Sequence, residues 1–286
     1  MNHRADAGSL GLPNLIILAL FFWLGFAPTA GAACKGEDGG SGVVTAVNDG
    51  ETLILDDGRA VRLMGVIGPK RARIGPGSDA RAQMESALSG LTLGKKISLQ
   101  VDKRQRDRYG RLVAQIMVMN GAGPLWVQGA LVEEGLARVI SFPDNRLCTT
   151  ELLAKENDAR QAQKGLWKTG FFAVRPAEAE DLLFRLAQSY EIIEGEVRDV
   201  TELKGAFYIN FGQNWRRDFT AFVSAKSAGL FGASAGGGGN RSIDIAQLKG
   251  HHIRVRGWLK NFNGPSITIT HPEQIEILDS GKSAAR

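Results

Sequence analysis

Residues 43–66 read VVTAVNDGETLILDDGRAVRLMGV, and this stretch decides the fold. It holds three short apolar runs that are separated by Asp49-Gly50 and by Asp57-Gly58. Asp-Gly between apolar runs is a strong hairpin signal, because these residues tolerate the positive φ angles of tight turns. The stretch therefore predicts two successive β-hairpins.

The sequence after this stretch predicts more strands and three helices. Alternating apolar residues indicate strands at residues 96–101 and 112–119. Capping residues and glycine stops indicate helices at residues 80–88, ended near Gly90, and at residues 126–134 and 151–164. Five strands with three helices fit a small barrel with the helices packed against it.

The strand pattern starts again at Tyr190. Strand candidates lie at residues 192–197, 206–211, 218–224, 253–259, 266–270 and 275–278. A glycine-rich run at residues 229–240 lacks a following Lys-Ser/Thr pair, so it predicts a surface loop and not a phosphate-binding loop. This half predicts a second small barrel, of the OB type.

The composition is that of a globular protein. Of 286 residues, 43% are hydrophobic and 23% are charged, which excludes a wholly disordered or collagen-like chain. The formal net charge of +5 permits an anionic partner such as nucleic acid. Two cysteines exclude both a disulfide-dense scaffold and a zinc site of four thiolates.

Residues 1–33 have the pattern of a secretory signal peptide. The apolar run at residues 15–27 is short for a membrane span, and Ala30-Gly31-Ala32 fits a cleavage site. We therefore expect an exported protein, periplasmic or secreted, without stable membrane insertion after cleavage. An uncleaved anchor and a lipoprotein modified at Cys34 are the alternatives. Export implies an oxidising compartment, in which Cys34 and Cys148 are expected to form a disulfide.

Five short motifs follow one another along the first half of the chain. They are DGET at 49–52, VRL at 61–63, DRYGR at 107–111, LVEEGLA at 131–137, and ENDAR at 156–160 with GLW at 165–167. In this order, the region from about residue 43 to residue 167 resembles the staphylococcal-nuclease-like (thermonuclease) family. The resemblance implies an OB-type five-stranded barrel with three helices. It also implies an activity that hydrolyses phosphodiesters of DNA and RNA with Ca²⁺.

Together, these patterns predict a β-rich α+β protein with two small barrels. The expected parts are a signal peptide (1–33), a staphylococcal-nuclease-like domain (34–172), a helical connector (173–189), an OB-like β domain (190–279) and a tail (280–286).

The resemblance also assigns functional residues. Arg62 and Arg111 match the family's two catalytic arginines, and arginine suits bidentate contacts to phosphate. Glu51 matches a Ca²⁺-ligand position with Glu in place of the usual Asp, and Asp49 matches a nearby acidic position. The residues expected to contact the substrate are Lys70, Arg108 and Tyr109.

The rest of the family's acidic site is replaced in this chain. Ile67 stands at the second metal carboxylate, Gly68 at a backbone ligand, and Lys70 at the glutamate that activates water. A protonated lysine neither holds Ca²⁺ nor acts as an efficient base, although a lysine with a depressed pKa could serve as one. Arg62, Lys70 and Arg111 are expected to form a pocket of mutually repelling cations, which an anion would stabilise.

Aromatic residues in the second half allow two interpretations. Trp215 and Trp258 interleave with Arg254 and Arg256, which suits either a nucleic-acid-stacking face or a core with arginines on the opposite strand face. In the first half, Phe142 is expected in the core, and stacking on a base of the substrate is the alternative.

Two further expectations concern exposure to solvent. Arg138 is expected at the surface. The three histidines of the second half lack ligand spacing and are expected to be exposed to solvent; they are His251, His252 and His271.

The sequence leaves three hypotheses for function open. The favoured one is an exported thermonuclease-like protein that binds nucleic acid or a related phosphorylated polyanion, with hydrolysis weak or lost because of Ile67 and Lys70. The second is an active metal-dependent endonuclease whose site is rebuilt from Asp49, Glu51 and Asp107. The third is an interaction module of the cell envelope.

Overall fold

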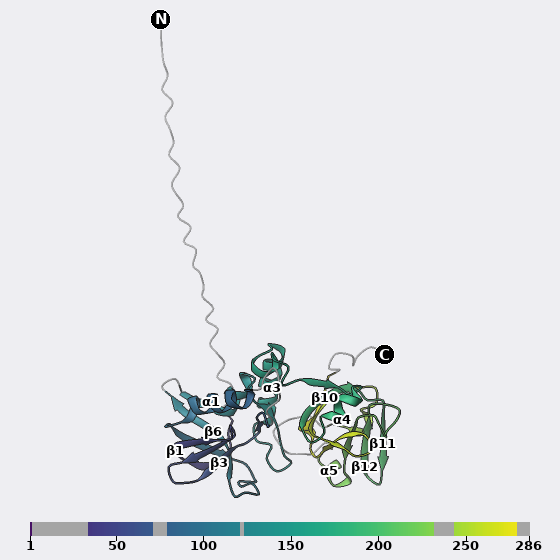
Figure 1. Ribbon diagram of the computed structural model, residues 1–286, viewed down its shortest axis with the longest axis horizontal. Coiled ribbons are helices and arrows are strands. Elements are labelled where there is room, and N and C mark those ends of the chain that lie inside the picture. The colour runs from purple at the N-terminus through teal and green to yellow at the C-terminus, as the bar shows by residue number, and fades with distance from the viewer. Residues whose placement is uncertain (2–33, 71–78, 121–122, 232–242, 279–286) are drawn as a thin grey trace. The chain divides into compact units, whose positions relative to one another are not determined.

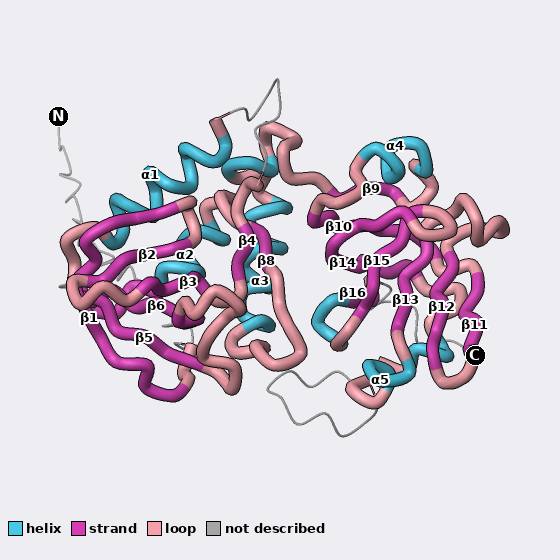
Figure 2. The backbone as a smooth tube through the Cα atoms, turned by 60° about the horizontal axis from the view of Figure 1, so that its bottom comes forward, coloured by secondary structure: helices cyan, strands magenta, loops and turns pink. Residues whose placement is uncertain are grey.

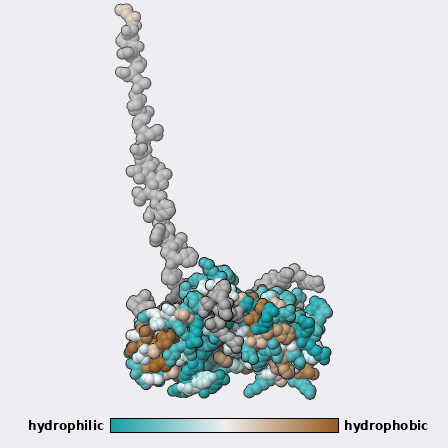
Figure 3. Space-filling model, in the orientation of Figure 1, coloured by the Kyte–Doolittle hydropathy of each residue, from teal (hydrophilic) through white to brown (hydrophobic). Residues whose placement is uncertain are grey.

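The computed structural model describes Met1 and residues 34–70, 79–120, 123–231 and 243–278, and Cys34–Arg286 forms one compact unit. The expected signal peptide, the tail and most of the glycine-rich run lie outside the described residues. Among the described residues, no helix is long and apolar enough to cross a membrane. The face shown in Figure 3 is mostly hydrophilic, with small scattered hydrophobic patches.

The first half folds into a closed five-stranded barrel (Figure 1). Its strands are β1 (Glu37–Asn48), β2 (Thr52–Leu55), β3 (Ala60–Leu63), β5 (Lys96–Val101) and β6 (Leu112–Asn120). The strand order is β3-β2-β1-β5-β6, and parallel pairing of β3 with β6 closes the ring. A further strand, β7 (Gly123–Trp126), pairs with β6. The OB-type barrel expected from the sequence is confirmed.

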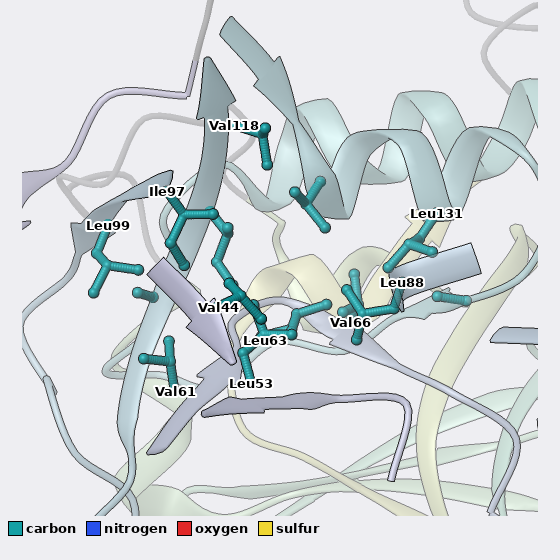
Figure 4. Packing of buried hydrophobic residues seen from close by; sticks show 14 of the residues in the cluster. Val44, Leu53, Val61, Leu63, Val66, Leu88, Ile97, Leu99, Val118 and Leu131 are labelled. Carbon is teal, nitrogen blue, oxygen red and sulfur yellow. The ribbon is translucent and has the colours of Figure 1, made fainter. Parts of the chain in front are cut away.

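The predicted hairpins form as the sequence indicates. Asn48 pairs with Thr52, and Asp49 and Gly50 between them have φ angles of 53° and 70°. Glu51 completes a three-residue turn, in which Asp49 and Gly50 adopt the positive φ angles that the Asp-Gly pair predicts. Along β3, Val61 and Leu63 point into the barrel and are buried, whereas Arg62 points outward. Figure 4 shows the resulting core, in which valine, leucine and isoleucine side chains from the strands meet those of the helices.

Three helices cover the first barrel: α1 (Ala80–Thr92), α2 (Val127–Glu133) and α3 (Thr149–Gln161). The expected end of the first helix near Gly90 is wrong, because the helix continues to Thr92. Leu88 and Thr92 are both buried on one face of α1, so packing sustains the last turn although Gly90 itself is exposed. Figure 2 shows the short strands β4 (Val66–Ile67) and β8 (Arg138–Val139) side by side near α3.

The expected disulfide is confirmed. Cys34 and Cys148 are bonded with their Cα atoms 5.5 Å apart, and both are buried beside Met117. The bond fixes the start of the barrel to the residue before α3.

The second half forms another β-sheet with the strand order β11-β12-β13-β15-β14-β10-β9, and β16 pairs with β14. The strands are β9 (Val174–Pro176), β10 (Tyr190–Glu196), β11 (Asp199–Leu203), β12 (Ala206–Asn210), β13 (Thr220–Val223), β14 (His252–Asn261), β15 (Pro265–Ile269) and β16 (Ile275–Ile277). The sequence patterns missed β9 and β11. Only part of the expected helical connector is helical, as α4 (Glu180–Arg185), and a short helix α5 (Ala225–Ala228) follows β13.

The topology of the second half repeats that of the first. β10 and β11 follow each other after a two-residue break, so together they correspond to the long first strand of a barrel. β13 and β15 pair in parallel, as β3 and β6 do in the first barrel. We therefore call the sheet β10–β16 the second barrel. Its core is built from the inward-facing apolar residues of these strands, separate from the core of the first.

Buried polar contacts join the two barrels within the compact unit. Arg256 of β14 is 2% exposed and binds Glu156 of α3, which is 1% exposed, at 2.7 Å. Burial opposes the charge of Arg256, but Glu156 and Glu276 outweigh it and raise its pKa. Tyr190 donates a hydrogen bond to the carbonyl of Val139 at 2.8 Å. Of the two interpretations of Arg256, the structure supports a packing role, because its charge is neutralised inside the protein.

Two expectations about exposure at this junction are wrong. His271 is fully buried, and its Nε2 lies 2.6 Å from the Oγ of Ser141. Arg138 is buried too, with its guanidinium stacked over Phe172 and Tyr190. Both residues are covered by packing between the barrels, which single-strand patterns do not reveal.

Candidate functional site

The site begins at a buried carboxylate beside an outward-facing arginine. Glu51 is the last residue of the turn between β1 and β2, and its carbonyl accepts a hydrogen bond from the backbone N–H of Leu63. This contact places the Glu51 side chain next to Arg62, whose Nη1 donates to Oε2 of Glu51 at 2.5 Å. The carboxylate is 1% exposed, whereas the side chain of Arg62 is 19% exposed.

The segment after β4 completes the surroundings of this carboxylate. The Nζ of Lys70 lies 2.6 Å from Oε2 of Glu51, and the N–H of Gly68 donates to Oε1 at 2.7 Å. A Cβ on Gly68 would clash with Sδ of Met84, so a side chain there would displace Met84. Both oxygens of Glu51 are therefore bound by protein donors, two of which are cations.

A tight loop holds the second arginine. Asp107 accepts backbone hydrogen bonds from Tyr109 and Arg111 through Oδ1, and Gly110 turns the chain with a φ of 79°. Oδ2 of Asp107 binds Nε of Arg111 at 2.8 Å. Burial opposes the charge of Asp107, but these hydrogen bonds outweigh it, and its pKa lies below the ordinary value. The DRYGR motif thus encodes a rigid support for the Arg111 guanidinium.

The parallel pairing of β3 with β6 brings the two arginines to the same end of the barrel. Arg62 lies in β3, and Arg111 immediately precedes β6, whose first residue pairs with Val61. Nη1 of Arg111 reaches Oγ1 of Thr52 at 2.9 Å. Thr52 itself pairs with Arg62 across the β2–β3 hairpin. The expected convergence of these groups on one end of the barrel follows from this register.

A cavity of about 890 Å³ opens at this end of the barrel, and we call it the basic cavity. Six basic and three acidic side chains line it: Arg62, Lys70, Arg104, Arg106, Arg108, Arg111, Asp49, Asp107 and Asp144. Arg106 and Arg108 donate to neutral acceptors, the carbonyl of Gly110 and the hydroxyl of Tyr109, each at 2.7 Å. The wall of the cavity therefore carries a positive excess.

The predicted mutual repulsion of bare cations is not what the structure shows. Glu51 lies between Arg62 and Lys70 and neutralises part of their charge, and Asp107 does the same for Arg111. The sequence argument treated Glu51 as a metal ligand, so it left these cations without a counter-ion. Arg71 and Arg73, which follow Lys70 in the sequence, lie outside the described residues.

The residues present do not fit the Ca²⁺ that the family implies. Ca²⁺ takes six to eight oxygen ligands. Here Glu51 has both oxygens occupied, Ile67 is a buried aliphatic, and the ammonium of Lys70 sits on Glu51. Among the described residues, no group of three or more histidine, cysteine, aspartate or glutamate side chains is arranged to hold a metal ion.

Two aromatic residues that the sequence did not assign to the site line the basic cavity. Phe142, expected in the core, is 47% exposed, and Trp258 of the second barrel is 42% exposed. Tyr109, which was predicted to contact substrate, is 67% exposed beneath the guanidinium of Arg108. The exposure of Phe142 could not be found from its own segment, because that segment is apolar.

Comparison with known proteins agrees with this architecture. The family model described as staphylococcal nuclease homologue matches residues 60–169. The thermonuclease of Staphylococcus hyicus is 26% identical over 157 residues, which cover 54% of this chain and 90% of that protein. An uncharacterized endonuclease of Escherichia coli O157:H7 is 30% identical over 129 residues, which cover 44% of this chain and 76% of that protein.

The first half is an OB-type barrel with arginines at the end that carries the cavity. This architecture and these similarities place the first half in the class of nuclease-fold proteins. The chain belongs to the staphylococcal nuclease family. This membership supports a function related to nucleic acid. The family match ends at residue 169, before the second barrel begins.

Proposed function

We propose that this chain is an exported nuclease-fold protein that binds nucleic acid or a related phosphorylated polyanion in the basic cavity, with phosphodiester hydrolysis weak or lost. The observation that carries the proposal is the state of Glu51. A carboxylate that is 1% exposed and bound by Arg62, Lys70 and a backbone N–H serves as a counter-ion. It has no free oxygen with which to hold a metal.

The basic cavity provides what phosphate binding requires. Arg62 and Arg111 are only about one-fifth exposed, so their guanidinium groups are held in place before any ligand arrives. Arginine forks match phosphate oxygens bidentately, and pre-positioned groups lose little conformational freedom on binding. Lys70, 45% exposed, adds a further positive charge.

Hydrolysis would need a second carboxylate to hold the metal ion and a base to activate water, and the geometry favours neither. Ile67 is apolar and buried, and Lys70 as an ammonium paired with Glu51 has no basic lone pair. The rebuilt site of the alternative hypothesis would draw on Asp49, Glu51 and Asp107. Asp107 is fully engaged by Arg111 and the loop backbone, which leaves only Asp49 with a carboxylate oxygen near solvent.

The export part of the proposal rests on the signal-peptide pattern of residues 1–33, and the disulfide supports it. The disulfide between Cys34 and Cys148 is compatible with an oxidising compartment outside the cytosol. Fractionation of cells that express the full chain, with detection of the protein in the periplasm or medium, would test it. Retention of all the protein in the cytosol with reduced cysteines would refute export.

The binding proposal is tested on the full chain with a fluorescently labelled single-stranded oligonucleotide. We expect binding at low salt that weakens steeply as salt is raised, as contacts to phosphate do. The double variant Arg62→Ala, Arg111→Ala should lose at least about tenfold in affinity. Arg59→Ala is the matched control, because Arg59 lies on the same hairpin, pairs with Asp57 and does not line the cavity.

Hydrolysis is measured on the same strand with Ca²⁺ and with EDTA. We expect no difference between the two conditions. Rapid cleavage that requires Ca²⁺ and disappears in Glu51→Ala would contradict the proposal and establish the rebuilt nuclease.

A further inference from the structure

The second barrel contributes a side chain to the wall of the basic cavity. Trp258 lies on β14, where Ile253, Val255 and Leu259 point into the second barrel and are buried. Because side chains alternate along a strand, Trp258 points out of that barrel. It lines the same cavity as Arg62 and Arg111 of the first barrel.

Packing fixes the position of this indole. Trp258 pairs with Tyr190 across β10 and β14, and the two rings meet edge to face, with centroids 5.9 Å apart and an interplanar angle of 77°. Tyr190 is buried and anchored by its hydrogen bond to Val139 of the first barrel. Trp258 nevertheless remains 42% exposed, so part of its indole is open to solvent.

Phe142 presents a second exposed ring in the same cavity. It follows β8 and is held by backbone hydrogen bonds to and from Asn145, at 3.4 and 3.0 Å. Its side chain is 47% exposed although its neighbours Ile140 and Ser141 are buried. Two supported aromatic rings and an array of guanidinium groups thus line one cavity of about 890 Å³. Ligand pockets of about 300–1,000 Å³ accommodate small organic molecules such as a nucleotide.

We propose that Trp258 and Phe142 hold a base of a single-stranded nucleic acid whose phosphate lies against Arg62 and Arg111, so that the second barrel supplies part of the binding site. This inference rests on the proposed function. Aromatic side chains beside a cationic groove are the means by which proteins bind single strands, because each base offers a flat face for stacking. In a duplex those faces are stacked on one another, so duplex DNA would gain nothing from Trp258.

The test compares a short thymidine oligonucleotide, of about six residues, with an abasic strand of the same length and charge. Fluorescence anisotropy at low salt measures the affinity of the full chain for both. We expect Trp258→Ala to weaken binding of the thymidine strand by about 5-fold or more, and to leave binding of the abasic strand unchanged. Phe142→Ala should show the same selective loss, and Trp258→Phe should restore most of the affinity.

The matched control is Trp215→Ala. Trp215 is 51% exposed, belongs to the second barrel and stacks with Arg216, but it does not line the basic cavity. The Trp215→Ala variant should bind both strands with the affinity of the wild type. Equal losses on the thymidine and abasic strands in Trp258→Ala, or the same losses in Trp215→Ala, would overturn the role of Trp258.

The outcomes separate this inference from the proposed function. A wild type that binds neither strand would refute both. Loss of binding in Arg62→Ala, Arg111→Ala with unchanged affinity of Trp258→Ala for both strands would leave the proposed function standing and refute the inference.

Discussion

The two barrels have the same strand order but use their charged residues differently. In each, the first strand leads through a tight turn to the second, and the third pairs in parallel with the fifth. In the first barrel, Arg62 and Arg111 face a cavity, whereas in the second, Arg256 is buried against Glu156. The same topology therefore supports a candidate site in one barrel and a structural junction in the other.

The turn between the first two strands is one residue longer in the first barrel than in the second. In the second barrel, Leu203 pairs with Ala206, so only Lys204 and Gly205 lie between them, with φ angles of 52° and 76°. The first barrel has the same two positive φ angles at Asp49 and Gly50, but Glu51 follows before the ladder resumes. That additional residue turns inward and becomes the counter-ion of the cavity. The two barrels therefore share a framework, and the difference in their roles comes from their loops.

The largest expected effect concerns the covalent bond of the first barrel. Cys34 and Cys148 are 114 residues apart in sequence, and a loop of that size is worth nominally about 4–5 kcal/mol in the chain-entropy account. We expect the double variant Cys34→Ser, Cys148→Ser to lower the free energy of unfolding by that order. Urea denaturation of oxidised and reduced wild type checks it. Equal stability of the two forms would show that the bond constrains nothing.

The next effect tests whether Arg256 is structural. Arg256→Ala leaves Glu156 charged and buried, and breaking a buried pair in this way costs about 3–5 kcal/mol. Chemical denaturation measures the loss. The control is Lys249→Ala, since Lys249 pairs with Asp199 at 2.9 Å but is 67% exposed, and an exposed pair contributes at most about 1 kcal/mol. Similar losses in both variants would contradict the contrast between buried and exposed pairs.

The buried histidine makes the junction sensitive to acid. Burial and the nearby Arg146 lower the pKa of His271 to about 4, with Asp144 opposing, whereas the unfolded chain has the ordinary value of 6.5. The unfolded state thus binds the extra proton between those values, so stability is complete above about pH 6.5 and falls as the pH drops toward 4. The loss amounts to at most about 3 kcal/mol.

Denaturation midpoints between pH 7 and pH 4 measure this slope. In His271→Asn the slope across that range should become flatter. An unchanged slope would assign the acid sensitivity to other groups, such as carboxylates whose pKa values lie lower still.

A smaller effect distinguishes a counter-ion from a metal ligand. Glu51→Gln removes the buried negative charge but keeps an oxygen that can accept from the N–H of Gly68. Arg62 and Lys70 then attract phosphate more strongly, and we expect affinity for a single-stranded oligonucleotide to rise by about 3- to 10-fold at low salt. Anisotropy titrations measure it, with Glu133→Gln as a control distant from the cavity. Weaker binding would show that Glu51 supports the ligand directly.

Much of the first barrel could be predicted because its signals are local. The Asp-Gly turns, the alternation around Arg62 and the DRYGR loop each fix their own geometry, and the register of β3 with β6 brings the two arginines together. The disulfide followed from counting two cysteines in a chain whose sequence predicts export. Helix ends were less certain, since burial of Thr92 outweighed the local signal of Gly90.

The rest depends on contacts between distant segments. Nothing near Trp258 indicates that it borders a cavity of the first barrel, and nothing near His271 indicates that Ser141 lies against it. The counter-ion role proposed for Glu51 could not be predicted from the sequence for a different reason. The position of Glu51 in the sequence matched a metal ligand of the family. Only the positions of Lys70 and Gly68 in the structure show that both carboxylate oxygens of Glu51 are bound by the protein.

The central claim is that Glu51 serves as a counter-ion and holds no metal. Isothermal titration of the full chain with Ca²⁺ tests it most directly. Glu51 lacks a free oxygen and Ile67 offers none, so we expect a dissociation constant no better than about the millimolar range, the weak limit of Ca²⁺ sites in proteins. Glu51→Ala should leave the titration unchanged. Micromolar Ca²⁺ binding that Glu51→Ala abolishes would contradict the claim.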